Sequence, residues 1–483
     1  MNTSEFREFG KSAVDYIADY LDNIRDKKVI SSKKPGFLQN KLTKSTPING
    51  DPWQDVMRDV DQLIVPGLSH WQSPNFHAFF PTSNSYPGIV GELMCAGLGA
   101  VAKDWISNPA CVELEVKMMD WLAKLLDLPK EFLNSSEGPG GGVIQNAASE
   151  STLVAVLSGM ARSVKNEQIL NPHRSEAEIK SKLVTYTSLH SNCSVEKAGL
   201  LASAPMRLLA TDKHNRLRGH TLEEAIRKDR EQGFIPCCVV ATLGTTGTCS
   251  FDNLEEIGLI CRRENIFLHV DAAYAGAAFV CPEYRHYMKG VDYVDTFSFN
   301  PHKWMLVNSD CSAMWFRDTS EFSEAYRVQK SMPETEIQPH KEVYGIDIEN
   351  WQIPNIRRFR ALKLWFVLRT YGVQGLRKHI RDQCSLAEYF TELLKVDDRF
   401  EVLNSVMGLV CFRVMGDDSV TRKLLEKISE RRNLFLTPYT HEDRMLIRFV
   451  ICSPFTQKED IKYAWNEIVS TLNLILDVER IKG

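Results

Sequence analysis

The stretch Ser298-Phe299-Asn300-Pro301-His302-Lys303-Trp304 decides the fold that we expect for this chain. It begins at the end of an apolar run that is typical of a buried strand, and it carries a single lysine. Burial disfavours the charged form of a lysine, and a neutral amine can form a Schiff base with an aldehyde. The stretch therefore fits a cofactor lysine, although taken alone it is more often a solvated strand end.

The stretch from Ile266 to Gly276 adds a carboxylate. Its β-prone residues predict a buried strand, and Asp271 stands where that strand ends. Ligands of open α/β sheets bind outside the carboxyl ends of the strands. A carboxylate there can pair with a protonated pyridine nitrogen, and the small Ala272 and Ala273 leave room for a flat ring. On its own, Asp271 is better explained as a helix N-cap.

A third stretch, residues 138–152, supplies a candidate phosphate site. It begins with Gly-Pro-Gly-Gly-Gly, continues with a short apolar segment and ends in small residues that open a helix. Free backbone N–H groups and the positive end of a helix dipole bind phosphate, and Ser149 can add a hydroxyl. A glycine-rich loop alone is a weak signal. The order phosphate loop, strand-end aspartate, strand-end lysine is much stronger, and it indicates pyridoxal phosphate (PLP) as the cofactor.

With these motifs the chain resembles the PLP-dependent aromatic L-amino acid decarboxylases, the group that includes dopa, tyrosine and tryptophan decarboxylases. The motifs His70–Pro74, Ser107–Glu115 and Trp351–Pro354 extend the resemblance over essentially the whole chain. The resemblance implies an α/β fold of the aspartate-aminotransferase type (fold type I), in which helices flank a mainly parallel sheet and a small α+β domain follows. It also implies a homodimer.

The resemblance further implies a role for individual residues. Lys303 would hold PLP covalently, and Asp271 would pair with its ring nitrogen. The other residues implied to bind the cofactor are Ala148, Ser149, Thr246, Ala273, Asn300 and His302. An aromatic, turn-rich segment would form the wall on the substrate side, with Trp71, Phe79, Phe80, Pro81 and Thr82.

Composition excludes several other classes of protein. Of the 483 residues 43% are hydrophobic and 25% charged, and the net charge is −4, so nothing favours binding to nucleic acid or to a membrane. The first residues lack the apolar core of a secretory signal, and no apolar run reaches the length of a membrane span. The twelve cysteines have no CxxC spacing. We therefore expect a cytoplasmic protein with reduced thiols and no metal site.

The pattern along the chain predicts three parts. Residues 1–85 show helical spacing, and the resemblance places this segment against the partner subunit. Residues 86–378 alternate strand and helix signals, as expected of the PLP domain, and residues 379–483 form the small C-terminal domain. The expected strands are Leu183–Tyr186, Met206–Ala210, Cys238–Leu243, Ile266–Val270, Thr296–Phe299, Ser312–Phe316, Leu409–Val414 and Met445–Ile451.

Two positions depart from the decarboxylase pattern. In one motif the decarboxylases carry a histidine that stacks on the cofactor ring, whereas this chain has Asn192, with His190 two residues away. Asparagine in this position resembles the insect 3,4-dihydroxyphenylacetaldehyde synthases. In a second segment, Met332 stands near the place of a tyrosine of the plain decarboxylases, and Tyr326 and Tyr344 are alternative tyrosines.

Both departures affect the same chemical step. Loss of carbon dioxide leaves a carbanion, and its protonation to an amine requires a positioned acid. Neither asparagine nor methionine has such a proton, so a longer-lived carbanion can lose an electron to O2. The expected function is therefore decarboxylation coupled to oxidative deamination of an aromatic L-amino acid, with L-dopa as the expected substrate and Asn192 as the residue that sets the outcome.

Two other functions remain open. One is an aromatic L-amino acid decarboxylase that releases the amine, and the other is a PLP-binding protein with little activity. Lys103 lies in a stretch where the family has apolar and aromatic residues, so the choice among aromatic amino acids also stays open.

Overall fold

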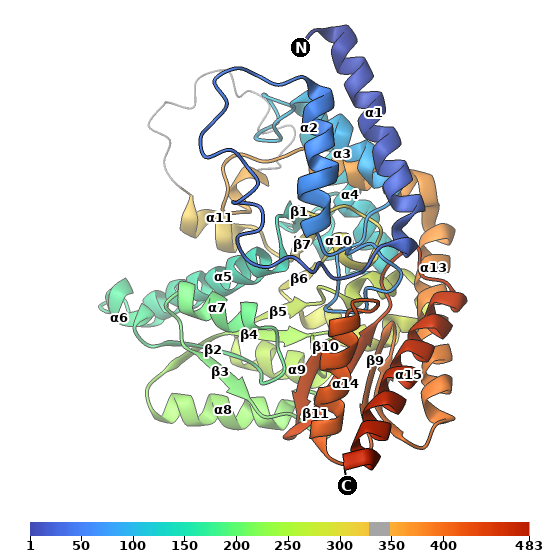
Figure 1. Cartoon of the computed structure of the whole chain (residues 1–483). Helices are drawn as coiled ribbons and strands as arrows, with labels where there is room; N and C mark the ends of the chain where they lie inside the picture. Colours follow the sequence, from blue (N-terminus) through green and yellow to red (C-terminus); the bar gives the residue numbers. More distant parts are fainter. Residues whose placement is uncertain (328–347, 483) are drawn as a thin grey trace. The chain divides into compact units, whose positions relative to one another are not determined.

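The computed structural model describes residues 1–327 and 348–482, coloured along the chain in Figure 1. They form two compact units, one of Thr82–Asp382 and one that joins Met1–Pro81 to Gln383–Gly483. Most of the expected N-terminal segment therefore shares a unit with the C-terminal domain. The division into three parts and the packing of the first part on a partner remain predictions.

A seven-stranded sheet forms the centre of the unit Thr82–Asp382, with the strand order β1-β7-β6-β5-β4-β2-β3 (Figure 1). The neighbours from β6 to β3 pair in parallel, and β7 runs antiparallel to both β6 and β1. The seven strands are β1 (Gly141–Gln145), β2 (Leu183–Ser188), β3 (Met206–Leu209), β4 (Ile235–Thr242), β5 (Phe267–Asp271), β6 (Thr296–Phe299) and β7 (Ser312–Phe316). Apolar runs such as Cys-Val-Val-Ala in β4 suit a sheet that is covered on both faces.

The antiparallel strand β7 lies between β1 and β6, which places the carboxyl end of β1 at the same end of the sheet as that of β6. Because β7 opposes both of its neighbours, β1 and β6 run in the same direction. Gln145 at the end of β1 pairs with Ser312, and Phe299 at the end of β6 pairs with Ala313, so these two ends lie on adjacent rows. The loops that follow β1, β2, β4, β5 and β6 consequently all begin at the same end of the sheet, where these strands have their carboxyl ends.

Helices of this unit flank the sheet. The 23-residue helix α5 packs on β4 and β5 through small and branched residues, and α13 is interrupted at Gly372, where φ is 60°. The helices are α3 (Tyr86–Leu98), α4 (Pro109–Leu126), α5 (Ala148–Leu170), α6 (Glu176–Lys180), α7 (Cys193–Leu201), α8 (Gly219–Glu231), α9 (Leu254–Glu264), α10 (Pro301–Trp304), α11 (Ser320–Tyr326) and α13 (Arg360–Lys395). Among the described residues, no helix is long and apolar enough to cross a bilayer.

The unit of Met1–Pro81 and Gln383–Gly483 contains a four-stranded antiparallel sheet with the order β10-β11-β9-β8. The backbone of His77 bonds to Phe435 and to Val450, which ties the N-terminal segment to this sheet. The strands are β8 (Phe400–Val406), β9 (Leu409–Val414), β10 (Thr437–His441) and β11 (Arg444–Val450). The helices are α1 (Thr3–Asp22), α2 (Trp53–Asp59, continued by a π-helical turn Val60–Ile64), α14 (Asp418–Arg431) and α15 (Lys458–Lys482).

The predicted fold class is confirmed, and three expected strands have the expected bounds. The other five differ by one to three residues at their ends, as strand ends commonly do. The strands β8 and β10 were not anticipated from the sequence.

The glycine-rich stretch requires one correction, because its last two glycines do not form the expected turn. Gly141 and Gly142 begin the buried strand β1, which the sequence did not predict. A Cβ atom on Gly142 would lie 2.6 Å from the ring of Trp315 on β7, and one on Gly140 would collide with the carbonyl oxygen of Glu131. These glycines therefore allow close packing, and the turn that follows β1 is the candidate phosphate site.

Candidate active site

Asp271 is the last residue of β5, and its side chain is almost completely buried. It lies in register with Thr242 of β4 and Ser298 of β6, and its Oδ1 accepts a hydrogen bond of 2.9 Å from the backbone N–H of Ala273. Burial raises the pKa of Asp271, and the positive charge of Lys303 and the N–H of Ala273 oppose this rise. A positively charged group beside Asp271 would favour the carboxylate further.

The lysine segment lies directly beside this aspartate. The backbone N–H of Asn300 donates to Ala273 O at 3.1 Å, and that of Lys303 donates to Asn300 O at 3.0 Å. Lys303 lies in the short helix α10 and is partly exposed. The structure therefore brings Asp271, Ala273, Asn300 and Lys303 together at the end of adjacent parallel strands, as predicted.

His302 is held in one orientation. Its Nδ1 accepts a hydrogen bond of 2.9 Å from the backbone N–H of Cys311, and burial together with the charge of Lys303 lowers its pKa to about 4. The ring is therefore neutral near pH 7 with its proton on Nε2. This tautomer makes His302 a hydrogen-bond donor on the side away from Cys311.

Thr82 is attached to the lysine segment through its neighbour. The backbone N–H of Ser83 donates to His302 O at 3.1 Å, and Ser83 Oγ accepts from the N–H of Leu306 at 3.2 Å. Because of these two bonds, the partly exposed Thr82 begins next to the segment that carries Lys303.

The other four expected substrate residues belong to the unit that contains Met1–Pro81. There the rings of Trp71 and Phe79 stack with centroids 5.6 Å apart, and both keep an exposed face. Phe80 and Pro81 are buried, and Arg448 lies over the ring of Phe80. Their contact with a substrate remains a prediction.

The turn between β1 and α5 leads into a helix without a side-chain N-cap among the described residues. Helix α5 begins with Ala147 as its N-cap, an alanine side chain that cannot accept a hydrogen bond from the helix. Ser149 is exposed on the first turn, and Ala148 is nearly buried. The N–H groups of a first helical turn and the helix dipole favour an anion, so this turn suits a phosphate group.

Asn192 and Thr246 meet at the same edge. Asn192 caps α7, accepting from the N–H of Ser194 at 3.0 Å through Oδ1, while its Nδ2 donates to Thr246 Oγ1 at 2.9 Å. Thr246 is exposed on the loop after β4. The nearby His190 lies in the preceding turn, where its backbone N–H donates to Ser188 Oγ at 3.0 Å.

The loop that carries Thr246 packs against the loop after β5 and is held by hydrogen bonds of its own. Gly244 has a φ of 91°, and a Cβ atom there would lie 2.5 Å from the Cβ of Ala275, so only glycine allows this approach to the loop after β5. Within the loop, Thr248 Oγ1 lies 2.8 Å from Ser250 Oγ, and the N–H of Ser250 donates to Thr245 Oγ1.

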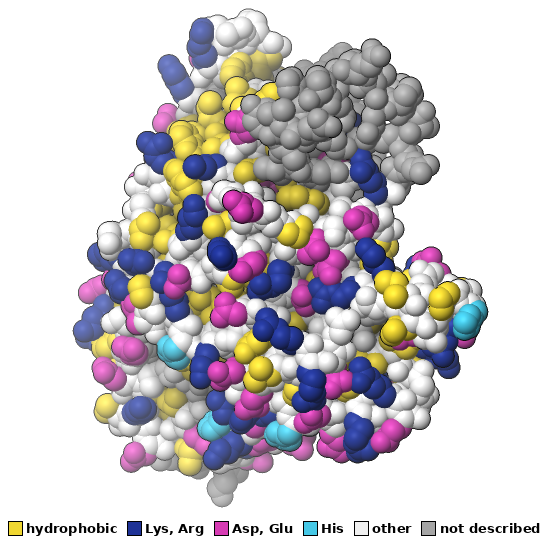
Figure 2. Space-filling model, turned by 180° about the vertical axis from the view of Figure 1, so that it is seen from behind, with side chains coloured by type: hydrophobic (Ala, Val, Ile, Leu, Met, Phe, Trp, Pro, Cys, Tyr) yellow, Lys and Arg dark blue, Asp and Glu magenta, His cyan; other side chains and the backbone are white. Residues whose placement is uncertain are grey.

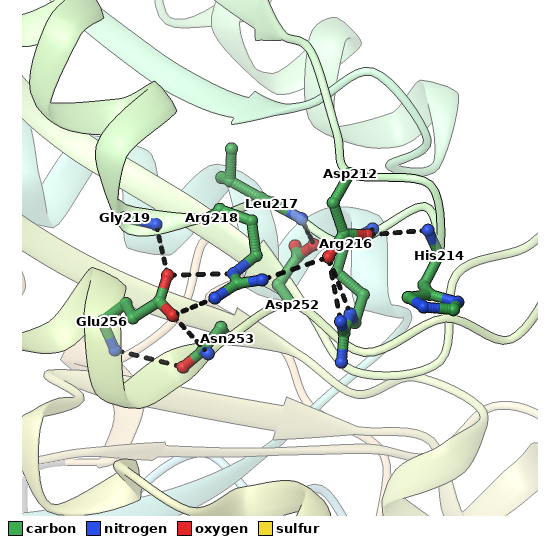
Figure 3. A network of polar contacts seen from close by, with 9 residues as sticks. All are labelled: Asp212, His214, Arg216, Leu217, Arg218, Gly219, Asp252, Asn253 and Glu256. Carbon is green, nitrogen blue, oxygen red and sulfur yellow. Dashed lines mark hydrogen bonds and ion pairs between the residues drawn. The ribbon is translucent and has the colours of Figure 1, made fainter.

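A polar network anchors the base of this loop, and Figure 3 shows it. The buried Asp252 accepts from the N–H groups of Leu217 at 2.7 Å and Thr242 at 2.8 Å. Burial raises the pKa of Asp252 to about 6 against these two donors. Arg218 joins Asp212 to Glu256 in the same network, so the end of β4 is fixed to α8 and α9 (Figure 3).

Of four further expected residues, two lie among the described residues. Met332 and Tyr344 lie outside the described residues. The hydroxyl of Tyr326 donates to Leu157 O at 3.3 Å, on the middle of α5. Lys103 is exposed, next to Ala102, whose backbone bonds to Arg357.

These residues fit PLP. The buried Oδ1 of Asn300 has no hydrogen-bond partner within the described chain, which leaves an unsatisfied amide beside the lysine. The uncapped turn at Ala148, the buried carboxylate of Asp271 and the partly exposed Lys303 are the kinds of group that the phosphate, the ring nitrogen and the aldehyde of PLP require. All twelve cysteines are free, and no metal-binding group of histidine, cysteine and carboxylate side chains occurs in the described residues.

The fold and the site define a PLP-dependent carboxy-lyase. Residues 35–415 match the pyridoxal-dependent decarboxylase conserved domain, and the chain belongs to this family. It is 49% identical to the aromatic-L-amino-acid decarboxylase of Drosophila melanogaster, over 97% of this chain and 91% of that protein. It is 48% identical to the 3,4-dihydroxyphenylacetaldehyde synthase of Aedes aegypti, over 99% of this chain and 92% of that protein.

A solved structure agrees with this assignment. The structure of Oryza sativa TDC with PLP and tryptamine superposes with a TM-score of 0.93 at 33% sequence identity, over 98% of this chain and 99% of that chain.

Several residues that complete the site were missed in the sequence. They are Asn146, Glu150, Asp310 and Arg360, which connect the phosphate turn to the lysine segment. The partners of Arg360 lie 50 and 214 residues away, so no local pattern could reveal them. Only the basic run Arg357-Arg358-Phe359-Arg360 at the start of a predicted helix was visible, and a solvated helix end explains it as well.

Proposed function

We propose that this protein converts an aromatic L-amino acid, with L-dopa as its substrate, to the aryl acetaldehyde. One molecule each of L-dopa, O2 and water give one molecule each of 3,4-dihydroxyphenylacetaldehyde, carbon dioxide, ammonia and hydrogen peroxide. The amino acid is oxidised by two electrons, and O2 accepts them to become hydrogen peroxide. When bound, PLP supplies the electron sink that makes bond cleavage at the α-carbon feasible.

The residues of the site divide this work. Lys303 supplies the amine that holds the cofactor, and the negative charge of Asp271 keeps a proton on the ring nitrogen. The first turn of α5, at Ala148 and Ser149, binds the phosphate with its N–H groups, and Asn300 and the Nε2–H of His302 add donors beside it. The small side chain of Ala273 lets the ring lie against the backbone.

The observation that carries the oxidative outcome is the state of Asn192. Both functional groups of its amide are engaged, Oδ1 with the N–H of Ser194 and Nδ2 with Thr246. An amide has no transferable proton near neutral pH, whereas an imidazole has one. Asn192 itself therefore offers no acid to the former α-carbon, and in our proposal this leaves time for reaction with O2.

The alternative function is an aromatic L-amino acid decarboxylase that releases the amine. It is supported by the relative from Drosophila melanogaster, which has that activity in its name and is as similar as the synthase from Aedes aegypti. In that case another residue would deliver the proton that Asn192 lacks.

For the substrate side chain we propose an aromatic wall. Thr82 would meet the substrate, and Trp71, Phe79, Phe80 and Pro81 would form the wall. The stacked rings of Trp71 and Phe79 keep exposed faces that suit a second aromatic ring. The exposed Lys103 is a candidate for tuning the choice among aromatic substrates.

We further propose a cytoplasmic homodimer. On α3 the exposed apolar side chains Tyr86, Val90, Leu93 and Met94 recur at helical spacing, and their exposed fractions lie between 43% and 54%. Hydrophobic side chains gather in the upper part of the face in Figure 2. Apolar helix faces of this kind are typical of surfaces that a second subunit covers.

Product analysis tests the proposed function. The purified protein with PLP and L-dopa in aerated buffer should release aldehyde and hydrogen peroxide in a one-to-one ratio to carbon dioxide. Asn192→His should raise the ratio of amine to aldehyde by about tenfold or more, since it restores an acid. Asn192→Gln is the control, because it keeps an amide and should still give aldehyde. Dopamine without hydrogen peroxide from the unchanged protein would overturn the proposal in favour of the decarboxylase.

A further inference from the structure

The two ends of the candidate cofactor site come from distant parts of the chain. The phosphate turn follows β1, and the lysine segment follows β6. Strand β7 separates them in the sheet. A cofactor that binds both at once gains affinity only if their separation is fixed beforehand.

One side chain joins these two segments. Arg360, the first residue of α13, donates through Nη2 to Oδ1 of Asn146 in the phosphate turn. Its Nε and Nη2 also donate to Oδ2 of Asp310, at 3.0 and 2.9 Å. Arg360 is 7% exposed, so its charge is buried and depends on these partners.

On the phosphate side, Asn146 is held from two directions. Its backbone N–H and its Nδ2 donate to Oε2 of Glu150, at 2.9 and 2.6 Å, while its Oδ1 receives Arg360. Glu150 belongs to the first turn of α5. The turn that presents Ala148 and Ser149 is thus clamped between its own helix and Arg360.

On the lysine side, Asp310 connects Arg360 to His302 through the neighbouring residue Cys311. Burial acts to raise the pKa of Asp310, but the hydrogen bond and charge of Arg360 and the charge of Lys363 hold it below its ordinary value. The next residue, Cys311, donates its N–H to His302 Nδ1 at 2.9 Å. His302 immediately precedes Lys303, so Arg360 is connected to the lysine through two short steps.

We propose that Arg360 is a positioning residue that sets the distance between the phosphate turn and Lys303, and that it thereby determines how tightly and in which orientation PLP is held. The proposal rests on the assignment of these two segments to the two ends of PLP. Arginine is required here because its planar fork serves acceptors in two directions, which the single ammonium group of lysine cannot do with the same geometry.

The test compares the binding of PLP with that of pyridoxal, which lacks the phosphate. The variant is Arg360→Lys in the full chain, and absorbance and circular dichroism of the bound cofactor follow the titration. We expect PLP to bind about tenfold or more weakly, while the affinity for pyridoxal changes less than about threefold, because pyridoxal uses only the lysine end. An altered circular dichroism band of bound PLP is also expected.

The matched control is Arg358→Lys. Arg358 also contacts Asp310, at 3.0 Å, but has no bond to Asn146 and is 52% exposed. It should change the affinity for PLP less than about threefold. Equal weakening of PLP and pyridoxal in Arg360→Lys, or no weakening of PLP, would overturn the proposal and leave Arg360 a residue of the fold alone.

Asn146→Ala alone should weaken PLP more than pyridoxal and so keeps the proposal testable if Arg360→Lys folds poorly, and a double-mutant cycle adds a second test if both variants fold. Asn146→Ala removes the acceptor on the phosphate side without touching Asp310. The two substitutions should weaken PLP by less than the product of their single effects, since both break the same link. Multiplicative effects would contradict the proposed link. These binding results do not depend on whether the product is aldehyde or amine, so failure of the proposed function would be distinguished.

Discussion

The floor and the rim of the candidate site differ in their burial. The floor, formed by Asp271, His269 and Asn300, is at most 3% exposed, and backbone bonds hold it between adjacent strands. The rim, formed by Asn192, Thr246 and Ser149, is partly or fully exposed at the starts of helices or in a loop.

If Asn192 sets the outcome as we propose, this difference in burial accounts for two activities within one family. A change in the floor disturbs packing, charge and cofactor together, so the floor suits whatever all members of the family share. A change in the rim alters one donor or acceptor near the reacting atoms and leaves the cofactor in place. The two related activities among the relatives are therefore most simply separated at the rim, where Asn192 lies.

The largest expected effect is the loss of Lys303. We expect Lys303→Ala to abolish covalent attachment of PLP and to lower kcat by about a thousandfold or more, because Lys303 supplies the amine for the Schiff base in our proposal. Borohydride reduction followed by mass spectrometry of the peptides measures the attachment. Lys103→Ala, at an exposed lysine, is the control and should be labelled like the unchanged protein. Labelling at another lysine in Lys303→Ala would show that the cofactor lysine is assigned wrongly.

The next effect tests the charge of the floor rather than its shape. Asp271→Asn keeps the volume and removes the negative charge, so we expect kcat to fall by about a hundredfold or more. The absorbance of bound PLP as a function of pH would report the lost charge. Asp252→Asn, at a second buried aspartate, should reduce thermal stability without changing that spectrum. If both variants behave alike, the charge of Asp271 has no specific role.

The floor was predictable from sequence because its residues lie in continuous strand-and-turn segments. Asp271 and Lys303 both follow short apolar runs, and the parallel pairing then forces their loops to one edge. The turn expected at the last two glycines of the glycine-rich stretch is a strand instead. Trp315 and the carbonyl oxygen of Glu131 leave no room for side chains at Gly142 and Gly140, and neither neighbour can be read from the local sequence.

The connections between segments could not be predicted. Arg360 contacts Asn146 and Asp310 only because helix α13 returns to the edge of the sheet, and a basic run at a helix start gives no hint of this. The clamp on Thr246 through Asn192 likewise depends on the register of β2 against β4.

A smaller expected effect is the dependence of the free energy of unfolding on pH, through the buried His269 of the floor. Burial lowers the pKa of His269 from 6.5 to about 3, so between these values the unfolded chain binds more protons than the folded one. Stability from this group is fully present above the unfolded pKa and is lost as the pH falls, by about 2 kcal/mol at about pH 5.

Urea denaturation at about pH 7 and about pH 5 measures this loss. In His269→Gln the difference between the two pH values should shrink by about 2 kcal/mol, since glutamine does not titrate. His220→Gln is the control at a histidine that is exposed on α8. An unchanged pH dependence in His269→Gln would mean that His269 accepts a proton without unfolding, which contradicts a closely packed floor.

The smallest expected effect is at the rim, at Ser149. Its hydroxyl is one of several donors on the first turn of α5, and water can replace part of its contribution because the residue is exposed. Ser149→Ala should therefore weaken PLP only about fivefold and should leave pyridoxal binding unchanged. Fluorescence titration with both compounds measures the two affinities, and Ser181→Ala, at an exposed serine beyond α6, is the control. A loss of a hundredfold would show that Ser149 behaves as part of the floor. No loss would mean that the backbone N–H groups hold the phosphate alone. The side chain of this rim residue would then contribute nothing to the affinity for PLP, in contrast to the buried side chains of the floor.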